Sequence, residues 1–277
     1  MLENTEVAHV AQFESGMAIQ AVVSAEIDIQ ISTAKKYPRN LGLSLKRIKD
    51  IACLTQETAI ECFYSLPRKD EHGNTKNITG MTIRMAEIVA SQYGNIRYGS
   101  RVMGHDGKMI TAQGICHDLE NNVAVTKEVQ RRITTRTGKT YGDDMIIMTG
   151  NAAASIAMRN AVFTVIPKAL MAQLEIEVRN TALGKNMSTE QRWVRARDSY
   201  KAIGVTEKQL MEHLQIVKHT ELTEDHFIHL IGLHTAITKE KMITVEEAFN
   251  PGNAGKDISE MVSGFDKLNQ AVNTEGK

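Results

Sequence analysis

Three segments typical of strands, separated by very short polar connections, constrain the fold most. They cover 96–103, 109–117 and 123–134, and the connections consist of turn residues such as His105-Asp106-Gly107. Parallel strands need crossover connections of a dozen or more residues, whereas antiparallel neighbours need only a tight turn. The sequence therefore predicts an antiparallel meander of these three strands.

Helical patterns precede this meander. Apolar residues recur at three- and four-residue steps over 17–36, which predicts an amphipathic helix, and a second helix fits 43–61. A hairpin is expected over 62–80, because the strand formers C-F-Y-S-L-P and N-I-T-G flank the polar segment R-K-D-E-H-G-N-T-K. A further helix over 82–93 leads into the meander.

A long helix is expected after the meander, over 145–180. Its stretch N-A-A-A-S-I-A-M-R-N-A-V-F is small and apolar nearly all round, which favours burial against the sheet. Pro167 should kink this helix or divide it in two. Shorter helices, several opened by a capping threonine, are expected over 188–203, 206–218, 223–238 and 244–249.

These elements predict an α+β fold, in which an antiparallel β-meander and a hairpin pack against a long helix. A small C-terminal helical domain follows. The expected divisions are an N-terminal arm (1–16), an α+β core (17–185), a helical domain (186–250) and a flexible tail (251–277).

The net charge of zero hides an uneven distribution. Residues 1–30 carry five acids and no base, residues 31–185 carry 22 Lys or Arg against 14 Asp or Glu, and residues 186–277 carry 11 against 14. Clustered cations release condensed counterions when they neutralise phosphates. The basic core is therefore a candidate for binding a polyanion, although an ordinary solvated surface would show the same balance.

The candidate contact residues are cations on the sheet, on its edges and on the long helix. Arg97 and Arg101 are four residues apart on one expected strand, so alternation places them on the same face. Arg159 and Lys168 are expected to project from the long helix. The predicted DNA-binding set is Arg97, Arg101, Lys127, Arg131, Arg132, Arg136, Lys139, Arg159 and Lys168.

Motifs for nucleotide or metal chemistry are weak. Gly138-Lys139-Thr140 resembles the end of a phosphate-binding loop, but Ile133 stands where that loop needs a glycine. The carboxylates of 118–120 and 143–144 could hold a divalent cation for phosphodiester cleavage, but neither pair has a recognisable general base beside it. We expect no catalytic residues, no cofactor and no metal, and hence a protein that is not an enzyme.

The histidines and cysteines suggest structural roles. His226, His229 and His234 lie on one expected helix without a ligand pattern, so we expect them on the surface. The three cysteines show no C-x-x-C spacing and are expected to be buried apolar side chains.

Several segments resemble phage single-strand annealing proteins of the Redβ, RecT and Erf kind. The similar segments are T-A-K-K-Y-P-R-N (33–40), C-F-Y-S-L-P-R (62–68), I-R-M-A-E-I-V-A-S (83–91), A-Q-G-I-C-H-D-L-E (112–120) and A-S-I-A-M-R-N-A-V-F-T-V-I-P-K-A-L (154–170). The resemblance covers about residues 20–182 and gives no catalytic motif. It implies ATP-independent pairing of DNA strands by a ring or helical oligomer.

The expected function is therefore binding of single-stranded DNA and annealing of complementary strands in phage recombination. The expected partners are single-stranded DNA and further copies of the chain, with residues 1–36 helping to join the copies. The C-terminal domain is a candidate for recruiting an exonuclease or a host single-strand-binding protein. We expect no membrane contact and a location in the cytoplasm of a bacterial host. A metal-dependent nuclease and a phage scaffold protein that does not bind nucleic acid are the alternatives.

Overall fold

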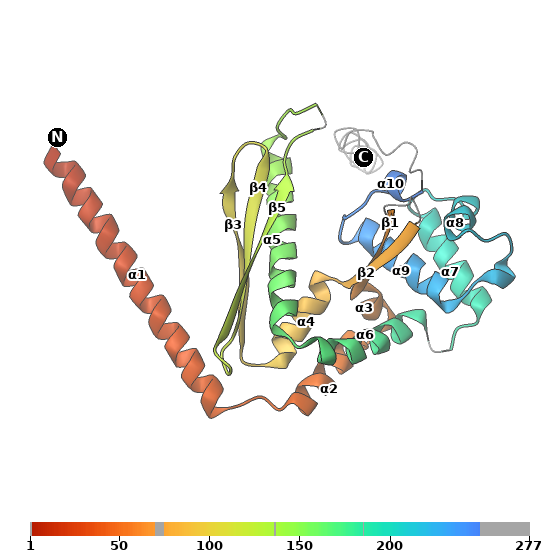
Figure 1. Cartoon of the computed structure of the whole chain (residues 1–277), viewed down its shortest axis with the longest axis horizontal. Helices are drawn as coiled ribbons and strands as arrows, with labels where there is room; N and C mark the ends of the chain where they lie inside the picture. The colour runs from red at the N-terminus through yellow and green to blue at the C-terminus, as the bar shows by residue number, and fades with distance from the viewer. Residues whose placement is uncertain (1, 70–74, 136, 185, 250–277) are drawn as a thin grey trace, which may run out of the picture.

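The computed structural model describes residues 2–69, 75–135, 137–184 and 186–249, and it has the α+β architecture expected from the sequence (Figure 1). A long N-terminal helix projects from a mixed core, and a set of short helices packs on the opposite side of that core. Within these residues no helix is both long enough and apolar enough to cross a membrane.

The N-terminal region forms three helices. Helix α1 (Leu2–Lys36) continues through the segment expected to form an arm. The helix expected over 43–61 is interrupted, because α2 (Leu41–Ala52) ends and α3 (Gln56–Glu61) starts anew. The hydroxyl of Thr55 caps α3 by accepting a hydrogen bond from the backbone N–H of Thr58 at 3.1 Å. One continuous apolar pattern thus spans two helices.

The predicted hairpin and the helix after it are confirmed. Strands β1 (Phe63–Lys69) and β2 (Thr75–Met81) pair in antiparallel fashion. Helix α4 (Ile83–Tyr93) is capped by Thr82 and is followed by Gly94, whose φ of 82° lies in the region that glycine tolerates best.

The predicted meander is also confirmed. Strands β3 (Ile96–His105), β4 (Met109–Asp118) and β5 (Val123–Arg132) form an antiparallel sheet in the order β3-β4-β5. Helix α5 (Asp143–Val165) runs along one face of this sheet (Figure 1). Alternate residues of β4 are consequently buried.

The contact between α5 and the sheet is very close. A Cβ atom added at Gly114 would lie 2.1 Å from the backbone carbonyl carbon of Ala157, so glycine is needed there. Pro167 divides the expected long helix, since α5 stops at Val165 and α6 (Lys168–Leu183) begins after the proline.

Short helices follow α6 as far as Phe249, and the threonine caps predicted at Thr206 and Thr223 are confirmed. The side chains of Thr206 and Thr223 each cap the helix that they precede. The helix expected to reach residue 218 ends earlier, because Gln215 adopts a left-handed conformation with φ of 57°. The helices are α7 (Thr189–Lys201), α8 (Glu207–Leu214), α9 (Glu224–Thr238) and α10 (Val245–Phe249).

Helix α9 joins this helical region to the hairpin. Gly232 lies so close to β1 that an added Cβ would be 2.7 Å from the backbone nitrogen of Ser65. The prediction that the α9 histidines lie on the surface is wrong for His229, which is only 6% exposed, and His234 is half-buried. The reason is that α9 packs against both the hairpin and α7.

Two of the three cysteines are buried as expected. Cys62 and Cys116 are fully enclosed, and Cys53 is half-buried. Burial raises the pKa of the Cys62 and Cys116 thiols to about 12, so both remain protonated at neutral pH. The expected tail over 251–277 lies outside the described residues.

Candidate nucleic-acid interface

The face of the β3-β4-β5 sheet that points away from α5 carries mostly polar side chains. We call this surface the open face. The strand register assigns to it Arg97, Arg101, Thr111, Gln113, His117, Thr126, Glu128, Gln130 and Arg132. Most of these side chains are half-buried or exposed donors and acceptors, as a surface that contacts a polar ligand requires.

Register divides the predicted contact residues between the two faces of the sheet. Arg97 and Arg101 share the open face, as their spacing predicted, and Arg132 joins them from β5. Lys127 pairs with Gly114 and Arg131 pairs with Ile110, and both partners face α5. One sheet surface therefore cannot present all the predicted strand cations.

The remaining predicted residues are placed differently again. Lys139 is exposed in the loop after β5, and Lys168 is exposed in the first turn of α6 instead of on the long helix. Arg136 lies outside the described residues. Of the predicted set, three arginines thus share the open face, whereas Lys139 and Lys168 lie outside the sheet.

Arg159 corrects the expectation that it projects from the helix. It is only 8% exposed, and its guanidinium carbon lies 5.3 Å from the centre of the Tyr64 ring. The small residues of α5 let the helix pack on both sides, so this arginine is enclosed between the helix and the hairpin. Arg159 is a packing residue in this structure.

Two of the three open-face arginines donate to neutral amide groups. Arg101 donates to the amide oxygen of Gln113 through Nε at 3.1 Å and Nη2 at 2.7 Å, and Arg97 donates to Gln30 at 3.2 Å. Within the described part of the chain, no ion pair involves Arg97, Arg101 or Arg132. Four residues along a strand span about 13 Å. The face therefore offers separated arginines that form no ion pair within the described residues, and it also carries the carboxylate of Glu128, which accepts from Gln113 at 3.5 Å.

The turn between β3 and β4 carries a further cation, Lys108. The hydroxyl of Thr140 donates to the Gly107 carbonyl at 2.8 Å, and the backbone N–H of Ile133 donates to the Lys108 carbonyl at 2.8 Å. The loop that carries Lys139 is thereby folded back beside Lys108. The sequence did not single out Lys108, because this contact depends on two separate turns.

A cleft of about 470 Å³ lies where α1 meets the beginning of β3. Ile29, Gln30, Thr33 and Ala34 line it from α1, and Ile96, Arg97 and Tyr98 line it from β3. Beyond this base the two elements diverge (Figure 1). The cleft thus opens beside the first open-face arginine.

Arg39 fixes the base of α1 to the turn after β4. Its side chain is 4% exposed, lies over the Tyr93 ring at 4.2 Å, and donates to both Asp118 and Glu120. We call these three charged residues the Arg39 cluster. Burial alone would raise the pKa of the Asp118 and Glu120 carboxyls. Both nevertheless have a lowered pKa, because Arg39 donates hydrogen bonds to both. Asn121 donates a further hydrogen bond to Asp118, and Asn95 donates one to Glu120.

The Arg39 cluster bears on the metal-site alternative. Asp118 and Glu120 already hold a guanidinium, so a cation would have to displace Arg39 to use them. Asp143 and Asp144 lie in the first turn of α5, where their negative charge interacts favourably with the positive end of the helix dipole. Among the described residues, no group of three or more His, Cys, Asp or Glu side chains has the geometry to hold a metal ion.

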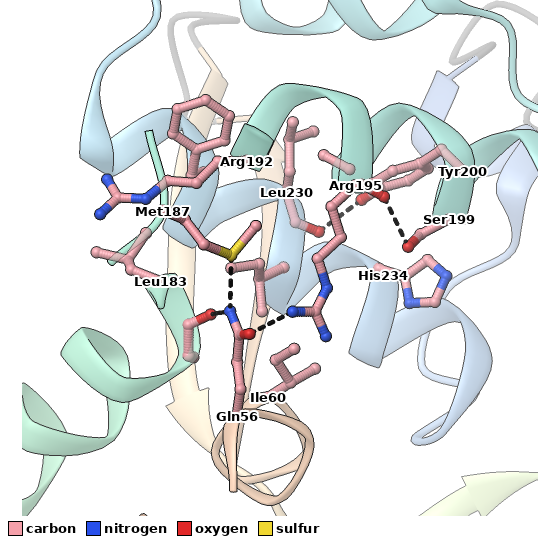
Figure 2. A pocket seen from close by; sticks show the side chains of 14 residues that line it. Gln56, Ile60, Leu183, Met187, Arg192, Arg195, Ser199, Tyr200, Leu230 and His234 are labelled. Atoms are coloured by element: carbon pink, nitrogen blue, oxygen red, sulfur yellow. Dashed lines mark hydrogen bonds between the residues drawn. The ribbon is translucent and has the colours of Figure 1, made fainter. Parts of the chain in front are cut away.

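A second cavity, of about 70 Å³, lies between α3, α6, α7 and α9 (Figure 2). Gln56 crosses it, donating to the Ala182 carbonyl at 2.8 Å and accepting from Arg195. Arg195 also donates to Glu57 at 2.9 Å. These contacts join the core to the C-terminal helices, so we interpret the cavity as a packing junction.

Comparison of the chain with protein-family models, with curated proteins and with solved structures gives no match.

Proposed function

We propose that this protein binds single-stranded DNA on the open face and anneals complementary strands without ATP, as a homo-oligomer acting in phage recombination. The observation that carries the proposal is the set Arg97, Arg101 and Arg132, which lies on the sheet face opposite α5 and forms no ion pair within the described residues. Arginine binds phosphate oxygens in bidentate fashion, and the neighbouring glutamines and threonines supply further donors and acceptors. The resemblance of residues 20–182 to phage annealing proteins points the same way.

Strand annealing needs no catalytic group. Pairing releases about 1.4 kcal/mol per base-pair step, so a protein has only to remove the obstacles. Those obstacles are the repulsion between phosphates and the collapse of each strand on itself. A basic surface relieves both by holding one strand extended.

A continuous track for DNA requires several copies of the chain, because one open face covers only a few nucleotides. We therefore include a homo-oligomer, as a ring or a helical filament, in the proposed function. Recruitment of an exonuclease or a host single-strand-binding protein by the C-terminal helices, and action in the bacterial cytoplasm, are further parts of this proposal.

The decisive experiment compares the two faces of the sheet. Replacing Arg97 and Arg101 with Gln should weaken binding to a single-stranded oligonucleotide. The slope of the logarithm of the binding constant against the logarithm of the salt concentration should become shallower by about 0.7 for each lost phosphate contact. The matched control replaces Lys127 and Arg131 with Gln, which removes the same charge from the face toward α5. Equal salt slopes for the two double variants would refute a role for the open face.

Annealing itself is measured with two complementary oligonucleotides, in the absence of ATP and of divalent cations. The proposed function predicts faster duplex formation with the wild-type chain than with the Arg97→Gln/Arg101→Gln variant. In a parallel reaction with added magnesium, cleavage of the strands would favour the nuclease alternative. Assembly without affinity for DNA would favour a scaffold protein.

A further inference from the structure

The cleft at the base of α1 has the composition of a ligand site. Its deepest residues are apolar, since Ala34 and Leu119 are only 1% and 6% exposed. Gln30 and Thr33 are exposed and Arg97 is half-buried, so polar groups accompany this apolar floor. Ligand pockets have volumes of about 300 to 1,000 Å³ and combine apolar walls with a few polar groups. The cleft, at about 470 Å³, meets both criteria.

Both walls of the cleft are held in place by contacts around it. The side chain of Asn95, just before β3, donates to Glu120 at 2.9 Å. The Arg39 cluster fixes the same end of α1 to the turn after β4. Arg97 donates to Gln30 at 3.2 Å and so links β3 directly to α1. A ligand would therefore meet a preformed site, which lowers the entropic cost of binding.

The lining indicates which chemical class of ligand fits. Arg97 is the only charged side chain among the described residues that line the cleft, so the site favours one anionic group beside a neutral body. Ile29 and Ile96 offer apolar surface to such a body, and Gln30 and Thr33 offer hydrogen-bonding groups. A nucleobase has flat faces that stack on other groups and polar edges, and one sugar joins it to a phosphate. A nucleotide thus matches the cleft in both respects.

The cleft is continuous with the open face, because Arg97 belongs to both. We propose that the cleft receives one nucleobase of the bound strand, while Arg97 contacts the phosphate next to that base. Arg97 keeps the role that the proposed function gives it, since the base itself is neutral. This inference rests on the proposed function and deepens it, because it adds a contact with a base to the phosphate contacts of the arginines.

A base held in this cleft fixes the position of the strand without covering its other bases. The bases that lie farther along the open face, toward Arg101, stay free to pair with a complementary strand. Helix α1 diverges from β3 beyond the cleft, so the strand has room to continue along the sheet (Figure 1). In an oligomer, each copy therefore anchors the strand at one base and leaves the bases between neighbouring clefts exposed.

The test compares two single-stranded oligonucleotides of equal length and equal charge. One carries normal bases, and the other is abasic throughout, so both offer the same phosphates. We expect the wild-type chain to bind the normal oligonucleotide about tenfold more tightly at the same salt concentration, because contacts with bases add to the electrostatic attraction.

Substitutions on α1 locate this preference for bases. Thr33→Leu narrows the cleft and Ile29→Ser removes part of its apolar wall, so each should abolish most of the preference and leave the salt dependence unchanged. The matched control, Ser32→Leu, adds similar bulk at an exposed residue that does not line the cleft, and it should keep the preference. Arg101→Gln should weaken the binding of both oligonucleotides alike. Circular dichroism verifies that each variant folds.

The outcomes separate this inference from the proposed function. Equal affinity of the wild-type chain for the two oligonucleotides would overturn the inference and leave the proposed function standing. A preference that survives both Thr33→Leu and Ile29→Ser would also overturn it, because the bases would then be contacted elsewhere on the surface. Binding of neither oligonucleotide would refute the proposed function and, with it, this inference.

Discussion

Lowering the pH from 7 to 5 should destabilise the fold, because the buried His213 and His229 bind protons less readily in the folded chain than in the unfolded chain. The rings of His213 and His229 stack with centres 5.1 Å apart, and their Nε2 atoms are within hydrogen-bond distance at 2.8 Å. The other ring nitrogen of His229 forms a hydrogen bond of 2.7 Å with the Ser65 hydroxyl. Burial lowers the pKa of both histidines, and the neighbouring His213 and His226 help to lower that of His229 to about 3.

The direction of the pH effect follows from these lowered pKa values. Above pH 6.5, which is the ordinary pKa of histidine, His229 is neutral in both the folded and the unfolded chain and contributes no pH dependence. Between pH 6.5 and about 3 the unfolded chain binds a proton that the folded chain excludes, so stability falls as the pH falls. At pH 5 this linkage amounts to about 2 kcal/mol for His229 alone.

Urea unfolding at pH 7, 6 and 5 measures the effect. Trp193, the sole tryptophan, is buried among the C-terminal helices and reports their unfolding by fluorescence. The loss of stability between pH 7 and 5 should be about 2 kcal/mol smaller in His229→Gln than in the wild type. The exposed His105 supplies the control, since His105→Gln should keep the wild-type loss. An equal loss in His229→Gln would refute the reasoning.

Four further substitutions test the packing. Arg39→Ala should cost about 3 to 5 kcal/mol in urea unfolding, because it leaves the Asp118 carboxylate buried without its partner, and Arg39→Lys should restore only part of the loss. Gly114→Ala should lower the melting temperature strongly, because the new methyl group would overlap the backbone of Ala157. Gly99→Ala, on the same sheet but with open space at that position, should be neutral or slightly stabilising, and a similar loss in both glycine variants would contradict this packing argument.

The sequence predicted the order of elements well where local chemistry is decisive. The short connections of the meander, the proline at 167 and the threonine caps each act within a few residues. The break between α2 and α3 was missed, because the apolar period continues through it and only the cap at Thr55 marks the new helix. His229 was misplaced because its burial comes from the hairpin, 164 residues away from it at Ser65.

The candidate site was predictable only in part. Strand alternation correctly placed Arg97 and Arg101 together, and it also requires that the adjacent Arg131 and Arg132 face opposite sides. Which side stays open depends on where α5 packs, and that is a tertiary property. The burial of Arg159 was equally hidden, because it requires the hairpin to contact the outer side of α5.

The Arg39 cluster fixes the C-terminal end of α1, so a small rotation at this end moves the N-terminal end of the helix by a large distance. A helix of 35 residues extends about 52 Å, so turning its base by about 10° displaces its tip by about 9 Å. Loosening of the Arg39 cluster would therefore be amplified at the far end of the helix. If α1 contacts a neighbouring copy, the ion pairs of Arg39 with Asp118 and Glu120 set the angle between successive copies.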